Sequence, residues 1–137
     1  PEPVYHYETY LKGEGRNAVA MAEKSREFLT DREDDRPFFL YFATSDPHRG
    51  GGTDKTSKLK LKADLFGNKP NDGAHEGVDE VFYDPAEVPI PPFLPDTPET
   101  REELAQYYQS DSRIDQGLGR LLNMLNEAGK SSNTIIL

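Results

Sequence analysis

The sequence contains no cysteine, no tryptophan and no long hydrophobic run. Without cysteine, its 137 residues hold no disulfide, no thiolate metal site and no cysteine nucleophile. No window approaches the roughly 18 apolar residues of a membrane-spanning helix, and residues 1–10 lack the basic start and apolar stretch of a signal peptide. The net charge of −9 argues against a nucleic-acid binder, because such proteins carry basic surfaces. We therefore expect neither a membrane segment nor a nucleic-acid partner.

Large apolar residues are also scarce. Leu, Ile, Val and Phe make up about 21% of the chain, close to the roughly 20% below which highly charged chains tend to be disordered. The length suits one domain at about 100–200 residues per domain. We therefore expect a thin core that something outside this chain completes, and we interpret residues 1–137 as a single partial domain, an internal fragment of a larger protein.

Two apolar runs and two helical patterns predict the fold class. Residues 37–43 (PFFLYFA) and 133–137 (NTIIL) have the length and composition of buried strands, although periodicity alone does not exclude a buried helix. Asn17 is a suitable N-cap for a helix over about 17–29. The order helix, strand, long excursion, helix, strand predicts an α/β fold with parallel strands and crossover helices.

The middle of the chain is irregular, and a long helix follows it. Residues 50–82 show no sustained period and read as a long loop excursion, while 83–97 form a proline-rich lead-in. Thr97 as N-cap, Pro98 at the first helical position and Gly129 as the stop then predict a helix over about 98–128.

His48 is the best candidate for chemistry. It follows the apolar run at 37–43, and in open α/β sheets ligands bind at the carboxyl ends of strands. Histidine changes charge near neutral pH, so an imidazole there could donate a hydrogen bond or protonate a leaving group. The alternative is a loop histidine that caps a turn.

Other charged residues carry weaker hypotheses. Residues 49–62 have a local charge of +4 and could attract an anionic substrate, although a solvated lysine-rich loop is the more frequent explanation. Asp111 and Asp115 lie four residues apart, and we expect them to bind loop backbone or an arginine. His6 and His75 have no partners at metal-ligand spacing, so we expect no metal site within this chain.

Two stretches carry a family resemblance. Residues 36–49 (RPFFLYFATSDPHR) resemble the middle motif of the sulfatase family within the alkaline-phosphatase-like superfamily. The proline-rich lead, the Arg-x-Asp-x-x-x-Gly pattern at Arg113, Asp115 and Gly119, and the Asn133–Thr134 pair resemble the second half of that motif set. The Asp-Pro-His-Arg layout is most similar to the heparan N-sulfatase (sulfamidase)-like branch.

The resemblance implies a sulfuric ester or sulfamate hydrolase that acts on sulfated sugars, is calcium-dependent, uses formylglycine as nucleophile and is periplasmic or secreted. The motifs for the nucleophile and the calcium ligands are absent from this sequence, so the chain alone is expected to be inactive and to bind neither group. His48 matches a family position that contacts the sulfate. Ser45 and Arg49 beside it are expected to bind substrate; Ser45 stands where close relatives often have His.

Two alternatives remain open. One is a phosphatase or phosphodiesterase of the same superfamily. The other is a non-catalytic module that binds a polyanion through residues 49–62. We also expect the chain to self-associate through the unpaired strands at 37–43 and 133–137, because exposed strand edges favour association.

Overall fold

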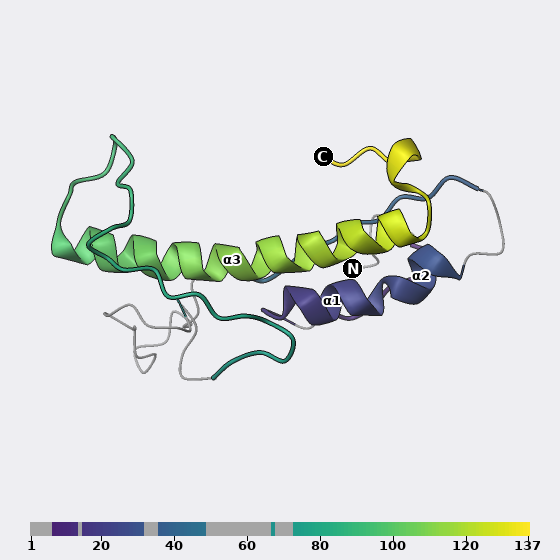
Figure 1. Cartoon of the computed structure of the whole chain (residues 1–137), viewed down its shortest axis with the longest axis horizontal. Helices are drawn as coiled ribbons and strands as arrows, with labels where there is room; N and C mark the ends of the chain where they lie inside the picture. Colours follow the sequence, from purple (N-terminus) through teal and green to yellow (C-terminus); the bar gives the residue numbers. More distant parts are fainter. Residues whose placement is uncertain (1–6, 14, 32–35, 49–66, 68–72) are drawn as a thin grey trace, which may run out of the picture.

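A long helix forms the spine of the molecule (Figure 1). The computed structural model describes residues 7–13, 15–31, 36–48, 67 and 73–137. Its elements are α1 (Ala18–Lys24), α2 (Arg26–Thr30), α3 (Pro98–Glu127) and the 3₁₀ turn η1 (Ser131–Asn133). Helices α1 and α2 pack against the C-terminal half of α3, and the proline-rich loop lies beside the N-terminal half. None of the described helices is long and apolar enough to cross a membrane.

The ends of the helices follow their local sequence. The Asn17 side chain accepts a hydrogen bond from the backbone N–H of Ala20 at 2.9 Å and so caps α1. Thr97 caps α3 in the same way by accepting from Thr100 N–H at 3.2 Å. At the other end Gly129 has φ +68°, and the N–H of Lys130 donates to the carbonyl of Leu125 at 2.9 Å. This Schellman arrangement requires a left-handed residue, which glycine adopts without strain.

The helix predicted over 17–29 is divided in two at Ser25. This residue is the C-cap of α1 and precedes α2, and its hydroxyl donates to the carbonyl of Met21 at 3.2 Å. Helix α3 agrees with the helix predicted over 98–128 except at its last residue.

Helix α1 approaches α3 closely at Gly117. A Cβ added to Gly117 would lie 2.4 Å from Ala18 Cβ and 2.6 Å from its backbone carbonyl carbon. Two small residues therefore let the two helix backbones touch.

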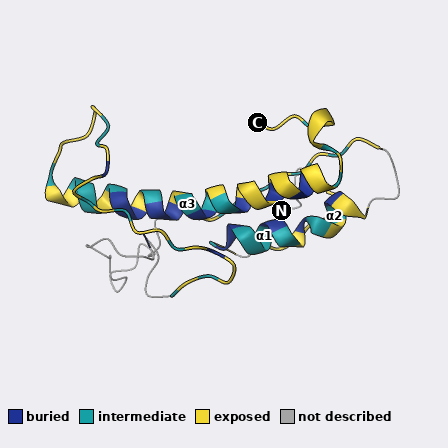
Figure 2. Ribbon diagram, viewed as in Figure 1, coloured by how far each residue is buried: buried dark blue, intermediate teal, exposed yellow. Residues whose placement is uncertain are grey.

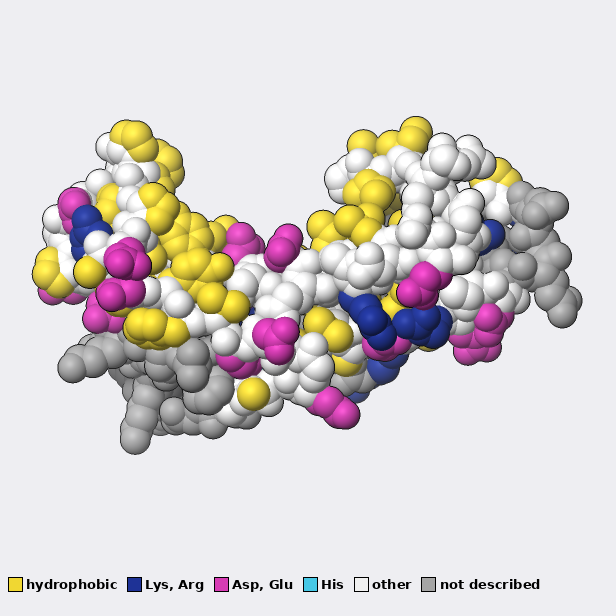
Figure 3. All heavy atoms as spheres, viewed as in Figure 1, with side chains coloured by type: hydrophobic (Ala, Val, Ile, Leu, Met, Phe, Trp, Pro, Cys, Tyr) yellow, Lys and Arg dark blue, Asp and Glu magenta, His cyan; other side chains and the backbone are white. Residues whose placement is uncertain are grey.

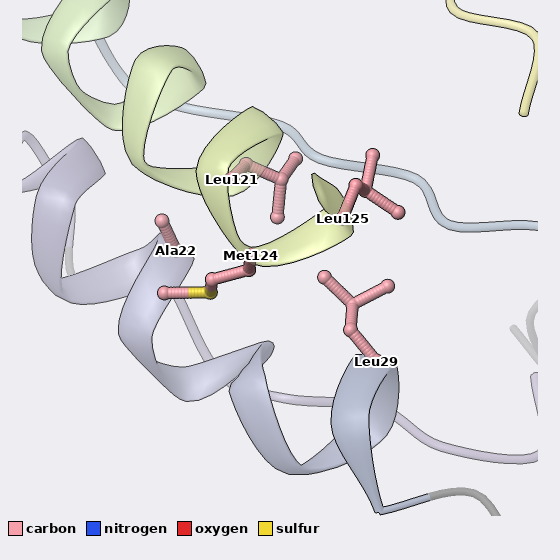
Figure 4. Close-up of a cluster of buried hydrophobic side chains, with 5 residues drawn as sticks. All are labelled: Ala22, Leu29, Leu121, Met124 and Leu125. Atoms are coloured by element: carbon pink, nitrogen blue, oxygen red, sulfur yellow. The ribbon is translucent and has the colours of Figure 1, made fainter. Parts of the chain in front are cut away.

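The apolar core lies at one end of this contact (Figure 4). Its buried side chains come from α1, α2 and the C-terminal end of α3: Ala22, Leu29, Leu121, Met124 and Leu125. Phe28, Phe38, Leu40 and Phe42 pack against them, and the rings of Phe28 and Phe38 meet edge to face at 5.6 Å. The core is thin, as the composition predicts.

The prediction of an α/β fold with parallel strands is wrong for the structure seen here. The described residues contain helices, turns and irregular segments but no β-strand. Neither segment predicted as a strand forms one: residues 37–43 are irregular, and in 133–137 Asn133 belongs to η1 while the remaining residues are irregular. The physical reason is that a strand needs a neighbour for its ladder of hydrogen bonds, whereas segment 37–43 lies against helices.

Segment 37–43 nevertheless alternates in burial. Phe38, Leu40 and Phe42 face the core, whereas Phe39 and Tyr41 are 77% and 69% exposed. Within the described residues, one side of this hydrophobic run is therefore packed against the core, and the other side is exposed.

The proline-rich loop is held by one arginine. Arg101 pairs with the Asp96 carboxylate through Nε (2.6 Å) and Nη2 (2.7 Å). Its Nη1 donates to the carbonyls of Pro85 (3.2 Å) and Ala86 (3.0 Å). The Arg101 guanidinium holds the pKa of Asp96 below its ordinary value. Of the excursion predicted at 50–82, the structure describes Gly67 and residues 73–82, and the rest lies outside the described residues.

Candidate functional site

His48 lies in a tight turn that begins at Thr44. The backbone N–H of His48 donates to the carbonyl of Ser45 at 3.0 Å, and the Thr44 hydroxyl donates to the carbonyl of Asp46 at 2.8 Å. The peptide bond between Asp46 and Pro47 is cis. The N–H of Ser45 also donates to the carbonyl of Gly15 at 3.1 Å. Hydrogen bonds within the turn therefore hold its shape, and one further hydrogen bond attaches it to the loop before α1.

Asp46 is the buried centre of this turn. Its side chain is 0% exposed, and it lies between two arginines from different parts of the chain. Arg113 Nε, from the middle of α3, donates to Asp46 Oδ2 at 2.6 Å. Arg16 Nη1, from the loop before α1, donates to Asp46 Oδ1. Each carboxylate oxygen thus receives a charge-assisted hydrogen bond, the strong kind of protein hydrogen bond.

The buried network continues along α3. Arg113 Nη1 donates to Gln109 Oε1 and lies 3.7 Å from Glu80 Oε2, and Gln109 Nε2 donates to the same carboxylate. With Arg16 and Asp46, the four ionised side chains sum to zero charge. This balance makes their burial tolerable, since an isolated buried charge is very costly. The buried face of α3 here is polar, with Gln106, Gln109, Ser110 and Arg113 at most 1% exposed (Figure 2).

Neighbouring loops are attached to the same region. Gly67 (φ +60°) passes so close to α3 that an added Cβ would lie 2.8 Å from Ser110 Oγ. Gln116 exchanges two hydrogen bonds of 2.8 Å with the backbone of Asp79. Asn17 Nδ2 donates to the carbonyl of Glu76 at 3.0 Å.

An open hollow of about 630 Å³ lies on the turn. Its lining combines one arginine, two hydroxyl residues and the histidine, and the full set is Arg16, Thr44, Ser45, Asp46, Pro47 and His48. His48 and Ser45 are exposed on it, whereas the Asp46 side chain is buried. The structure therefore brings together two of the three residues predicted to act on substrate. Arg49 lies outside the described residues, as does the whole of the basic stretch 49–62.

Sequence reasoning missed Arg16 and the pairing of Arg113 with Asp46. We expected Asp111 and Asp115 to bind loop backbone or an arginine; both are exposed, and the carboxylate that Arg113 binds is that of Asp46. The sequence offers no local signal for this pair, because Arg113 and Asp46 lie 67 positions apart.

The described residues offer no fit for a cation. In the described part of the chain, no three His, Asp or Glu side chains gather as metal ligands. The best-placed carboxylate, Asp46, is already bound by two guanidinium groups. No chemical step can therefore be derived through a metal held by these residues.

Comparison with known proteins decides the family. The sulfatase family model matches residues 3–137. The chain belongs to the sulfatase family. This membership confirms the resemblance seen in residues 36–49 and in the second half of the sequence.

Two curated sulfatases are similar to this chain. N-sulphoglucosamine sulphohydrolase of Homo sapiens is 36% identical over 145 positions, which cover all of this chain and 28% of that protein. An ulvan-active sulfatase of Formosa agariphila is 28% identical over 120 positions, which cover 77% of this chain and 20% of that protein. The chain thus spans less than a third of the length of either sulfatase.

Proposed function

We propose that the protein containing this chain is a sulfohydrolase that cleaves the sulfate esters or sulfamates of sugars. In this proposal His48 is the general acid. The observation that carries the proposal is the exposed His48 on an open hollow, on a turn held by buried ion pairs. Family membership and the names of two sugar-related sulfatases support the reaction class.

The proposed role of His48 is to hold and deliver a proton. When the bond between sulfur and the leaving oxygen or nitrogen breaks, the electron pair goes to the leaving atom. A protonated imidazole beside it supplies the proton, so that a neutral alcohol or amine departs. Ser45 on the same hollow and Arg49, next in sequence, would bind the sugar or sulfate.

The nucleophile and any calcium belong, in this proposal, to parts of the protein outside this chain. Sulfatase chemistry with formylglycine and calcium would supply the attacking oxygen and stabilise charge on the sulfate. We also propose a periplasmic or secreted location, on family resemblance; fractionation of cells that express the full-length protein tests it, and activity confined to the cytoplasm would contradict it.

The first prediction is that His48→Ala lowers kcat of the full-length protein by about 10²–10⁴-fold, the usual loss for a general acid. Sulfate release would be measured from N-sulfoglucosamine, ulvan oligosaccharides and an aryl sulfate. The aryl sulfate should lose least, because its good leaving group needs little protonation.

His75→Ala is the matched control, since it removes a histidine from a different loop. It should leave kcat within about threefold of wild type, well short of the loss for a general acid. Equal losses on all three substrates, or a loss explained by a lower melting temperature, would contradict the role of His48. Turnover of an aryl phosphate without sulfate release would favour the phosphatase alternative, and heparin binding without any hydrolysis would favour the polyanion-binding module.

A further inference from the structure

We propose that Arg16 and Arg113 are positioning residues that orient His48 by gripping Asp46. The inference rests on the proposed function of His48. One guanidinium contacts both the centre and the end of the same turn. Arg16 Nη1 binds the carboxylate of Asp46, while Arg16 Nη2 donates to the carbonyl oxygen of His48 at 2.5 Å.

The shape of the arginine side chain suits this role. Its guanidinium is planar and carries several N–H donors in a fixed fork, so two contacts made by one group fix the relative position of their acceptors. Here the acceptors are the Asp46 side chain and the His48 backbone, two residues apart. The side chain of Arg16 is 16% exposed, so the contacts are largely shielded from water.

Arg113 fixes the other side of Asp46 to the longest helix. Both side chains are 0% exposed, and Nε lies 2.6 Å from Asp46 Oδ2. Arg113 therefore anchors the turn to α3. Arg16 and the hydrogen bond between Ser45 and Gly15 anchor it to the loop before α1. A side chain that must meet a reacting atom gains from such bracing, because a misplacement of about 1 Å can cost roughly 10²-fold in rate.

The test is a double-mutant cycle in the full-length protein. Arg16→Ala should lower kcat on N-sulfoglucosamine about 10–100-fold with KM nearly unchanged, the loss expected for a displaced catalytic group. The loss on an aryl sulfate should be smaller. In the His48→Ala background the same change should cost little more, because the group that Arg16 positions is already gone.

Arg26→Ala is the control, since Arg26 also forms ion pairs, but its partners Glu23 and Glu127 lie on α1 and α3 rather than on the turn. It should leave kcat unchanged. Equal losses from Arg16→Ala in both backgrounds would overturn the positioning role. If Arg16→Ala fails to fold, the cycle is read on Arg16→Lys, which keeps the charge but lacks the planar fork.

A second measurement does not depend on activity. The imidazole NMR signal of His48, assigned by its loss in His48→Ala, should shift or split in Arg16→Ala and stay in place in Arg26→Ala. An unchanged signal in Arg16→Ala would overturn the positioning role, whether or not the wild-type protein hydrolyses sulfate. A wild-type protein that hydrolyses no sulfate would overturn only the proposed function.

Discussion

Asp46 and Glu23 each accept hydrogen bonds from two arginines, in opposite environments. Asp46 is fully buried, so its pairing with Arg113 must offset a desolvation cost of several kcal/mol per ion. Glu23 is 37% exposed and bonds to Arg26 and Arg120, which hold its pKa below the ordinary value. Water and salt screen the Glu23 pairs, so they contribute little to stability. Burial, rather than the number of ion pairs, therefore decides how much each arginine contributes to stability.

A pair of substitutions tests this contrast. Arg113→Met should destabilise the protein by about 3–5 kcal/mol, since removing one partner of a buried pair leaves a charge poorly compensated. Arg120→Met removes an exposed partner of Glu23 and should cost at most about 1 kcal/mol. Calorimetric melting of the full-length variants checks both. A melting temperature for Arg113→Met as high as that of Arg120→Met would contradict the assignment of Asp46 as a buried anchor.

At the scale of elements, the sequence predicts well what depends on neighbouring residues. The caps at Asn17, Thr97 and Gly129 all form as expected, because each is a hydrogen bond within a few positions along the chain. Segment 37–43 shows the opposite case. Its composition fits a strand, but a strand exists only with a pairing neighbour, which composition does not specify.

The face of α3 that is buried could be predicted only at its C-terminal end. Leu121 and Leu125 are buried as their spacing indicates. The apolar residues of α3 recur at helical spacing, and this stripe includes Tyr107 and Leu118 further towards the N-terminus, yet these two are 43% and 36% exposed. Apart from Ala105, the side chains buried there are polar, and their burial depends on partners such as Asp46 and Glu80 from distant loops. Hydrophobic periodicity cannot reveal such a face.

The crossing of α1 and α3 gives the sharpest prediction at this scale. Gly117→Ala should destabilise the protein by about 1–3 kcal/mol, the cost of overpacking. The new Cβ would meet Ala18 backbone atoms at 2.6–2.7 Å, and backbone cannot move aside as a flexible side chain can. The helix preference of alanine, about 1 kcal/mol over glycine, opposes this cost without removing it.

Gly119→Ala is the matched control, because it lies two residues along the same helix with nothing within 4 Å of an added Cβ. It should stabilise the protein by up to about 1 kcal/mol. Melting temperatures that move in the same direction for both variants would contradict the close contact.

At the scale of the whole molecule, the candidate site lies where three parts of the chain meet. The turn at 44–48 is joined to the loop before α1 by Arg16 and to the middle of α3 by Arg113. The sequence indicated His48 and Ser45 through their position after an apolar run and through family resemblance. It could not indicate the two arginines that hold Asp46, because Arg16 and Arg113 lie 30 and 67 positions from Asp46 in the sequence.

The exposed apolar surface leads to the last prediction (Figure 3). Phe39, Tyr41, Ile135 and Ile136 are 57–87% exposed in this chain, and exposed apolar patches favour association. The self-association expected from the sequence therefore remains a prediction, but its basis is now apolar side chains rather than unpaired strands. The 137-residue chain, produced by itself, should form dimers or larger species at micromolar concentration in sedimentation velocity.

The double variant Phe39→Ser and Tyr41→Ser should reduce this association, because it removes large rings whose burial each contributes about 1.5–3 kcal/mol. Both side chains point away from the core side of their segment, so the fold should tolerate the change. Phe93→Ser is the control: Phe93 is 82% exposed but lies on the proline-rich loop. If residues 37–43 drive association, the double variant shifts the distribution towards monomer and the control does not. A chain that is monomeric at every concentration would show that this apolar surface is too small or too mobile to bind a second copy.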